Sequence, residues 1–331
     1  LTVSGAATLS TGAVSLNSNG GNILFGSTMA GGSQNLTIAV GTAAGTTTFT
    51  GAVSGMGAAA TGAAITLAST GLVDFQNTVS GANGILSTNA LGSTKFQGDV
   101  TLTNGDTGST FAGGVNFDGM TWSGFDGLTV SGAATLSTGA VSLNSNGSAI
   151  LFSSTLDGAQ TLGLTAGLGN ITFTGAVGLV SRLGAVTVTS GATVLASQTF
   201  TAASFTQSAG TVATTFAQAV NLTNQFDFTG QALSMNGVGS NVVGTSMDVT
   251  NAGLFTTANG ANITTAGTFI QDGAGANSLG GNITTTNSLI SFLRGVTLTS
   301  GILLNTGAGA GNILFSSTLD GAQTLGLTAG L

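Results

Sequence analysis

Short stretches of this chain alternate between hydrophobic and polar residues. In residues 171–174 (ITFT), the alternation of a strand turns Ile171 and Phe173 inward and both threonines outward. Val186 and Val188 follow the same phase, with threonines between and after them. Pairs such as Gly-Asn, Asn-Gly and Asp-Gly separate these stretches and supply the positive φ angles of tight turns. The pattern predicts many short strands joined by corners.

The sequence also repeats itself over long distances. Leu1–Gly20 (LTVSGAATLSTGAVSLNSNG) recurs without change at Leu128–Gly147, and Ile150–Leu168 recurs at Ile313–Leu331. A looser copy of the second block starts at Ile23. Such repetition is typical of arrays in which each unit buries its apolar side against its neighbours. We therefore expect residues 1–331 to form a single continuous repeat array.

The spacing of the phenylalanines suggests how the units stack. Phe152 and Phe173 differ by 21 in residue number, and Phe25 and Phe49 differ by 24. Antiparallel sandwiches or barrels compete with a parallel solenoid for such a pattern. Stacking of near-identical coils explains why the Gly-Asn-Ile corner motif recurs. A sandwich architecture offers no such explanation. We predict an all-β fold, a parallel β-solenoid (β-helix) of about 21-residue coils.

Three sets of residues have predicted positions in these coils. A core ladder places Ile150 and Phe152 beside Ile171 and Phe173. Asparagines of the Gly-Asn-Ile or Ala-Asn-Ile corner are expected to stack on one another, namely Asn22, Asn170, Asn262, Asn282 and Asn312. If the isoleucines of the Ile-Leu-Phe motif face the core, the leucines face outward and form a lateral contact stripe of Leu24, Leu151 and Leu314.

Composition narrows the class of protein further. Only 4% of residues are charged, all ten acidic residues are Asp, and there is no His, Cys or Pro. The shortage of Glu and Lys disfavours helices, and three scattered cations with a net charge of −7 argue against nucleic acid as a partner. The sequence contains no run of about twenty apolar residues, so it predicts no membrane-spanning helix. The absence of cysteine suits a protein that is exported unfolded.

The residues needed for catalysis are scarce. With no His, Cys, Glu or Tyr, the chain lacks most general acids, bases and nucleophiles. Asp118 and Asp126 form the best local acidic pair, but each precedes a glycine and is interpreted as a turn residue. Asp157 and Asp320 occupy equivalent positions, yet calcium requires six to eight oxygen ligands. We expect no enzymatic activity, no cofactor and no metal.

Exposed threonines offer an alternative function. Thr-x-Thr recurs at residues 48–50, 101–103, 172–174, 187–189 and 297–299, and flat ranks of this kind resemble those of ice-binding β-solenoids. Threonine is also simply a favoured exposed residue on strands. Trp122, with Phe117 and Phe125 nearby, is the one aromatic concentration that a glycan site would use, and we assign it to the core.

Residues 311–325 (GNILFSSTLDGAQTL) and 169–177 (GNITFTGAV) resemble the repeat tracts of very large bacterial surface proteins of the filamentous haemagglutinin-like kind. The resemblance covers most of the chain. It implies a parallel β-helical stalk at the cell surface that serves adhesion, cell contact or matrix building. The secretion-signal domain of that family and a receptor-binding tip have no counterpart in this sequence.

The sequence therefore predicts a non-enzymatic extracellular structural rod, either a stalk or a self-assembling fibre of a bacterial surface. Its expected partner is itself, end to end or side to side, together with cell-surface or matrix components. Because Leu331 falls inside a motif that continues after Leu168, we expect a segment of a longer chain or filament. The alternative is a binding module that uses flat Thr-rich faces to engage a glycan, a cell surface or ice.

Overall fold

The computed structural model describes residues 1–40, 45–57, 62–103 and 108–330. These residues form 44 short strands and no helix. Neighbouring strands are parallel, and the coils stack as a parallel β-solenoid of about 15 turns, with coils about 21 residues apart. The predicted fold class is confirmed.

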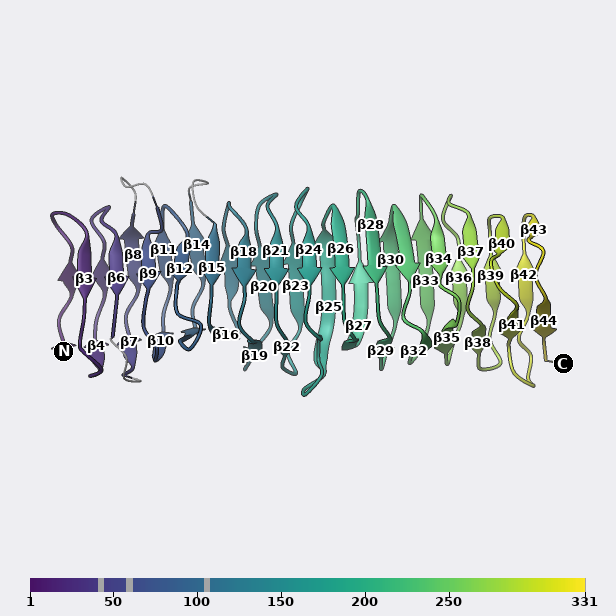
Figure 1. The fold of residues 1–331 in the computed structure, drawn as a ribbon, viewed down its shortest axis with the longest axis horizontal. Coiled ribbons are helices and arrows are strands. Elements are labelled where there is room, and N and C mark those ends of the chain that lie inside the picture. The colour runs from purple at the N-terminus through teal and green to yellow at the C-terminus, as the bar shows by residue number, and fades with distance from the viewer. Residues whose placement is uncertain (41–44, 58–61, 104–107, 331) are drawn as a thin grey trace. The chain divides into compact units, whose positions relative to one another are not determined.

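Contacts within the chain divide it into two compact units, Leu1–Asn170 and Ile171–Leu331. In unit 1 every third strand pairs, which gives three parallel sheets that we call faces A, B and C. The corresponding sheets of unit 2 are faces D, E and F. Figure 1 shows the strands of each unit side by side, with corners between them.

The strands of unit 1 follow one another from face A to B to C in each coil. Face A contains β1 (Thr2–Val3), β4 (Ile23–Phe25), β7 (Thr47–Phe49), β10 (Leu72–Phe75), β13 (Ser93–Phe96), β16 (Gly114–Asp118), β19 (Ala134–Ser137) and β22 (Leu156–Asp157). Face B contains β2 (Ala7–Thr8), β5 (Met29–Ala30), β8 (Val53–Met56), β11 (Val79–Gly81), β14 (Val100–Leu102), β17 (Thr121–Ser123), β20 (Val141–Asn144) and β23 (Leu162–Thr165). Face C contains β3 (Val14–Leu16), β6 (Leu36–Ile38), β9 (Ile65–Leu67), β12 (Ile85–Ser87), β15 (Ser109–Phe111), β18 (Leu128–Val130) and β21 (Ile150–Phe152).

Two long strands lie near the start of unit 2. β25 (Leu183–Ser190) and β27 (Phe200–Gln207) each extend over faces D and E, because β27 pairs with strands of both faces. Face D continues with β29 (Val220–Leu222), β32 (Gly239–Val243), β35 (Ala261–Thr265), β38 (Ile283–Thr285), β41 (Ile302–Asn305) and β44 (Leu325–Thr328). Face E continues with β30 (Phe226–Gly230), β33 (Met247–Asn251), β36 (Phe269–Gln271), β39 (Ile290–Phe292) and β42 (Ile313–Phe315). Face F contains β24 (Ile171–Phe173), β26 (Thr193–Ala196), β28 (Ala213–Phe216), β31 (Ala232–Met235), β34 (Phe255–Thr257), β37 (Asn277–Leu279), β40 (Val296–Leu298) and β43 (Leu319–Asp320).

The core of unit 1 is built by stacking like on like. Phe25, Phe49, Phe75 and Phe96 occupy the same inward position of consecutive coils on face A, with ring centroids 5.2, 5.0 and 5.3 Å apart and nearly parallel planes. In-register parallel strands place identical side chains about 4.8 Å apart, which is the spacing that stacked rings tolerate. Trp122 is buried against Phe96 on the inner side of face B, as expected.

The exact repeat does not return to the same face. The first copy, Leu1–Gly20, supplies β1, β2 and β3 on faces A, B and C, in that order. The second copy, Leu128–Gly147, supplies β18, β19 and β20 on faces C, A and B. The two copies are therefore separated by seventeen strands, or five coils and two thirds of another. Identical sequence lies on different faces.

Variation in coil length explains this offset. The starts of the two copies, Leu1 and Leu128, differ by 127 in residue number, which is close to six average coils. Individual coils of unit 1 depart from that average. The paired residues Thr48 and Asp74 differ by 26 in residue number, whereas the paired residues Asn116 and Thr135 differ by only 19. Corners absorb extra residues without disturbing the strands, so residue number alone does not fix the face.

Candidate functional surfaces

Charged and amide side chains gather on face A of unit 1. Asp74, Lys95 and Asp118 come from the adjacent strands β10, β13 and β16. Lys95 Nζ lies 2.8 Å from Asp118 Oδ2. Gln76 and Gln97 donate to the two carboxylate oxygens of Asp74, at 3.0 and 2.9 Å. In a chain with so few charges, this cluster is the first candidate for chemistry.

The environment of Asp118 favours its ionised form. Burial by itself raises the pKa of this carboxyl, but hydrogen bonds from Lys95, Thr138 and Ser137 and the charge of Lys95 outweigh it, so the pKa lies below its usual value. The hydroxyl of Thr138 donates to Asp118 Oδ1 from the next coil. With its charge matched and its oxygens occupied, Asp118 is suited to join coils and not to transfer protons.

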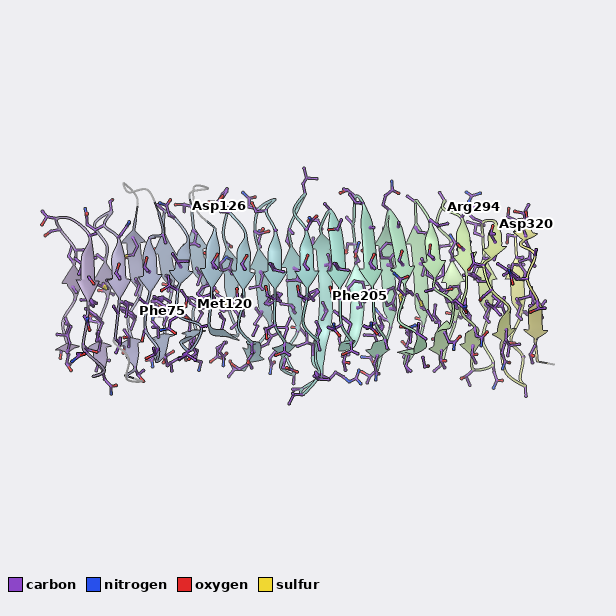
Figure 2. All side chains as sticks on the ribbon, in the orientation of Figure 1. Phe75, Met120, Asp126, Phe205, Arg294 and Asp320 are labelled. Atoms are coloured by element: carbon purple, nitrogen blue, oxygen red, sulfur yellow. The ribbon has the colours of Figure 1, made fainter. Side chains whose placement is uncertain are left out.

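The acidic residues singled out in the sequence do not converge. Asp118 ends β16 on face A, whereas Asp126 lies at the corner between β17 on face B and β18 on face C (Figure 2). Asp157 is half-buried on β22, and Asp320 is exposed on β43, where its Oδ1 accepts the Gly321 N–H at 2.7 Å. Across the described ranges, no three His, Cys, Asp or Glu side chains group to hold a metal ion.

Face E of unit 2 carries acidic residues that the sequence analysis missed. Asp227 and Asp248 are direct ladder partners on β30 and β33, and Asp272 follows β36. Burial first, and then the charges of Asp227 and Asp272, raise the pKa of Asp248. Thr250 donates its hydroxyl to Asp272 at 2.7 Å. Each of these aspartates follows the previous one by roughly one coil of sequence, which is the signal that reveals the column.

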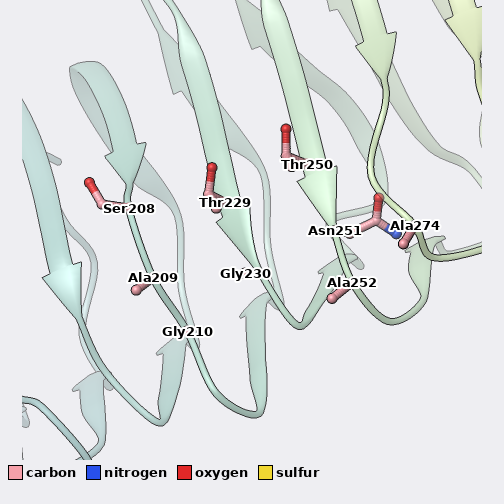
Figure 3. Close-up of a pocket in the computed structure, with 9 residues that line it drawn as sticks. All are labelled: Ser208, Ala209, Gly210, Thr229, Gly230, Thr250, Asn251, Ala252 and Ala274. Carbon is pink, nitrogen blue, oxygen red and sulfur yellow. The ribbon is translucent and has the colours of Figure 1, made fainter.

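A shallow groove of about 400 Å³ runs along the edge of face E. Its wall includes the hydroxyls of Ser208, Thr229 and Thr250, which point to the same side on successive coils (Figure 3). The remaining lining is formed by Ala209, Gly210, Gly230, Asn251, Ala252 and Ala274. The groove therefore offers a rank of hydroxyl groups one coil apart beside a lining of small side chains.

The residues of the predicted core ladder are all buried. Ile150 and Phe152 lie on β21, which pairs with β18 in unit 1, and Ile171 and Phe173 lie on β24, which pairs with β26 in unit 2. Their inward orientation follows from strand alternation, because the residue between each pair is partly exposed. The pairing of these two strands with each other stays a prediction.

The three leucines of the predicted contact stripe do not share a sheet within unit 1. Leu24 is 38% exposed on β4 of face A, whereas Leu151 is half-buried on β21 of face C. In unit 2, Leu314 is 48% exposed on β42 of face E. The stripe expectation assumed coils of constant length, and the offset of the repeat turns Leu24 and Leu151 to different sides.

Corner asparagines stack at one place in unit 2. Asn262 Oδ1 accepts the Asn282 N–H at 2.9 Å, and Asn282 Oδ1 accepts the Leu303 N–H at 2.8 Å. The column of Asn262 and Asn282 lies at the edge of face D. Asn241, which the sequence analysis missed because it follows Ser and not Gly or Ala, is a separate buried bridge between coils: its Oδ1 accepts the Val220 N–H at 3.0 Å, and its amide donates to the Asn262 backbone carbonyl at 3.0 Å.

The other predicted asparagines occupy separate corners. Asn312 precedes β42 of face E and is exposed, and Asn22 precedes β4 of face A, where its Oδ1 accepts the Thr46 N–H at 2.9 Å. Asn170 follows β23 and accepts the Ile150 N–H through its backbone carbonyl at 2.8 Å. The corner motif therefore caps individual coils on several faces and does not form one continuous stack within either unit.

No family model matches this chain, and comparisons with curated proteins and with solved structures return no match. None of the elements in the described part of the chain is a helix that could span a membrane. The parallel β-solenoid is compatible with a β-helical repeat protein.

Proposed function

We propose that this chain is a non-enzymatic structural rod of a bacterial cell surface or extracellular matrix, as either a stalk or a self-assembling fibre. The repeat style resembles that of filamentous haemagglutinin-like surface proteins, and the β-solenoid fold supports the same class. The absence of cysteine suits a chain that is exported unfolded and folds outside the cell.

One observation carries this proposal. The same twenty residues build three strands that start on face A in one place and on face C in another. A catalytic centre or a receptor site needs given side chains at a fixed place on one face. A repeated segment that starts on different faces instead preserves the features that every coil requires, namely inward apolar residues, corners and hydrogen-bonded pairing with the next coil.

The ionisable groups support the non-enzymatic part of the proposal. Asp118 is engaged by Lys95, and both oxygens of Asp74 accept hydrogen bonds from glutamines. A turnover assay on polysaccharides with the wild-type chain and Asp118→Asn tests it. Turnover that Asp118→Asn abolishes would place an active site on face A and contradict the proposal.

Self-association follows from exposed apolar side chains in a poorly charged surface. Leu24 and Leu314 are exposed at strand centres, next to small hydroxyl residues. Two measurements on the whole chain test the proposal together, namely negative-stain imaging for rods or filaments and sedimentation over a hundredfold concentration range. Leu24→Ser should weaken association, with Thr48→Ser on the same face as a control. Globular particles that stay monomeric would overturn the structural role.

The groove on face E favours a second candidate, a binding module for glycans. The Ser208 and Thr229 hydroxyls, one coil apart, can donate to and accept from successive sugar units of a chain that lies along the groove, and the Thr250 hydroxyl, which donates to Asp272, can accept. Thr229→Val and Thr250→Val keep side-chain shape and strand preference but remove the hydroxyls. Glycan-array binding that these variants abolish would favour this function, and binding that they leave unchanged would exclude the groove. Ice binding by the hydroxyl rank predicts thermal hysteresis that the same variants lower.

A further inference from the structure

The corner that ends each exact copy in unit 1 has the same backbone conformation on different faces. Asn19 and Asn146 both have a φ of 48°, and the glycines after them have φ values of 95° and 100°. In each copy, an asparagine side chain two residues earlier accepts the N–H of this asparagine, at 2.8 and 2.9 Å. The corner that ends each copy is therefore determined by the segment itself.

On their first two strands, both copies receive the next coil in the same register, whereas on the third strand Val14 pairs with Leu36 but Val141 pairs with Leu162, one residue closer in the sequence. Val3 pairs with Phe25 in the first copy, and Val130 pairs with Phe152 in the second. On the following strand, Ala7 pairs with Met29, and Ala134 pairs with Leu156. Register on these first two strands is thus specified locally, whereas the face on which the coil starts is not.

One corner differs between the copies, and its surroundings explain why. The positive φ lies at Gly12 in the first copy but at Thr138 in the second, with a value of 55°. Thr138 donates its hydroxyl to Asp118 of the preceding coil. A corner in the middle of the segment adjusts to the coil below, while the strand before it keeps its register.

From these observations we propose that the copies are interchangeable joints at which the array gains or loses a 127-residue block, with all later coils turned by one face. Inward and outward positions depend on the place within a strand and not on the face. Each coil after the joint therefore stacks on a coil of the same sequence as in the parent chain. At the joint itself, the same twenty residues precede the added block in both places. This inference rests on coil geometry and is independent of where the protein acts.

Two insertion variants of the full chain test the proposal. The turned variant repeats residues 21–147 after position 147, so the second copy of β4 follows β20 and lies on face C. The matched variant repeats residues 18–131 after position 131, which adds fifteen strands and returns the second copy of β4 to face A. We expect amide hydrogen exchange in the added block of the turned variant to stay within about tenfold of the same residues in the parent chain.

Disulfide pairing reports the face directly, because the chain has no cysteine of its own. In the turned variant, Thr129→Cys should cross-link with Leu24→Cys in the second copy, as Thr2 pairs with Leu24 in the parent. In the matched variant, Leu24→Cys of the second copy should cross-link with Asn116→Cys instead. Adjacent parallel strands bring such Cα atoms within disulfide range.

Each outcome decides the question. Protection together with the Thr129 cross-link in the turned variant supports the proposal, whether or not the matched variant folds. A turned variant that aggregates or is cleaved at the joint while the matched variant stays protected would show that the faces are distinct. Failure of both variants, or a cross-link through Asn116 in the turned variant, would also overturn it.

Discussion

Phe75 offers the sharpest test of the stacked core. Phe75, labelled in Figure 2, is fully buried. It lies between Phe49 and Phe96, with ring centroids 5.0 and 5.3 Å away and planes tilted by 7° and 4°. Truncation of a buried phenylalanine to alanine costs about 3–5 kcal/mol. Phe75→Ala also removes two ring-stacking contacts, each worth about 0.5–1.5 kcal/mol beyond the buried area. We therefore expect the local free energy of unfolding to fall by about 4 kcal/mol, in the upper half of that range.

Native-state hydrogen exchange is the suitable assay, because repeat arrays open locally and do not unfold in one step. The amides of Gln76 and Gln97 report the opening, since they donate to the carbonyls of Phe49 and Phe75, each at 2.9 Å. A loss of about 4 kcal/mol accelerates their exchange on the order of 10³-fold. Amides several coils away should change much less, since each coil contacts only its neighbours.

Phe125→Ala is the matched control, because Phe125 is 47% exposed at a corner. Its truncation should cost within about 1 kcal/mol, or less than tenfold in exchange. Phe75→Leu, which keeps most of the volume, should cost no more than about 1.5 kcal/mol and remains measurable if Phe75→Ala fails to fold. Equal effects of Phe75→Ala and Phe125→Ala would refute the stacked-core account.

Three further predictions concern polar groups. The pKa of Asp118 is lowered, so its contribution to the free energy of unfolding is fully present above pH 4 and is lost as pH falls through its folded-state pKa. Asp118→Asn should therefore destabilise its coil more at pH 7 than at pH 2, as local protection factors corrected for the intrinsic exchange rate at each pH will measure. The pKa of Asp248 is raised, so its contribution to the free energy of unfolding has the opposite pH dependence: it is present below pH 4 and is lost as pH rises through the folded-state pKa. Asp248→Asn should therefore be stabilising at pH 7 and neutral at pH 3. An Asp248→Asn effect that does not change with pH would contradict this assignment. Asn282→Ala removes the acceptor of the exposed Leu303 N–H, which water can replace, and should cost about 0.5–1 kcal/mol, whereas Asn312→Ala, for which no side-chain hydrogen bond is seen, should cost less than about 0.5 kcal/mol in the exchange assay.

Local features of the fold could be predicted from sequence because they are written within a few residues. Strand alternation identified Ile171 and Phe173 as inward, and the aromatic composition placed Trp122 in the core. The assignment of the same aromatic group to the core was wrong for Phe125, which is exposed. Phe125 belongs to a corner and not to a strand, so the alternation of neighbouring residues carries no information about its orientation. Corner glycines and asparagines marked where strands end, since only they adopt positive φ cheaply.

Contacts between coils were partly readable. Asp227 and Asp248 are separated by the length of one average coil, and a search of the sequence at that spacing finds the column. The contact of Lys95 with Asp118 instead joins positions that are not direct ladder partners, because Lys95 pairs with Asn116. A diagonal contact of this kind depends on side-chain length and strand geometry, which no residue spacing expresses.

The sequence by itself determined that this chain builds parallel coils and that strand residues such as Ile171 and Phe173 point inward. The tertiary structure alone decided the face on which each coil begins. Coils in unit 1 differ in length, as the pairs Thr48 with Asp74 and Asn116 with Thr135 show, because corners accommodate insertions at little cost while strands do not. These differences accumulate along the chain, so that a 127-residue repeat close to six average coils spans five coils and two strands, and identical residues such as Leu24 and Leu151 face different ways.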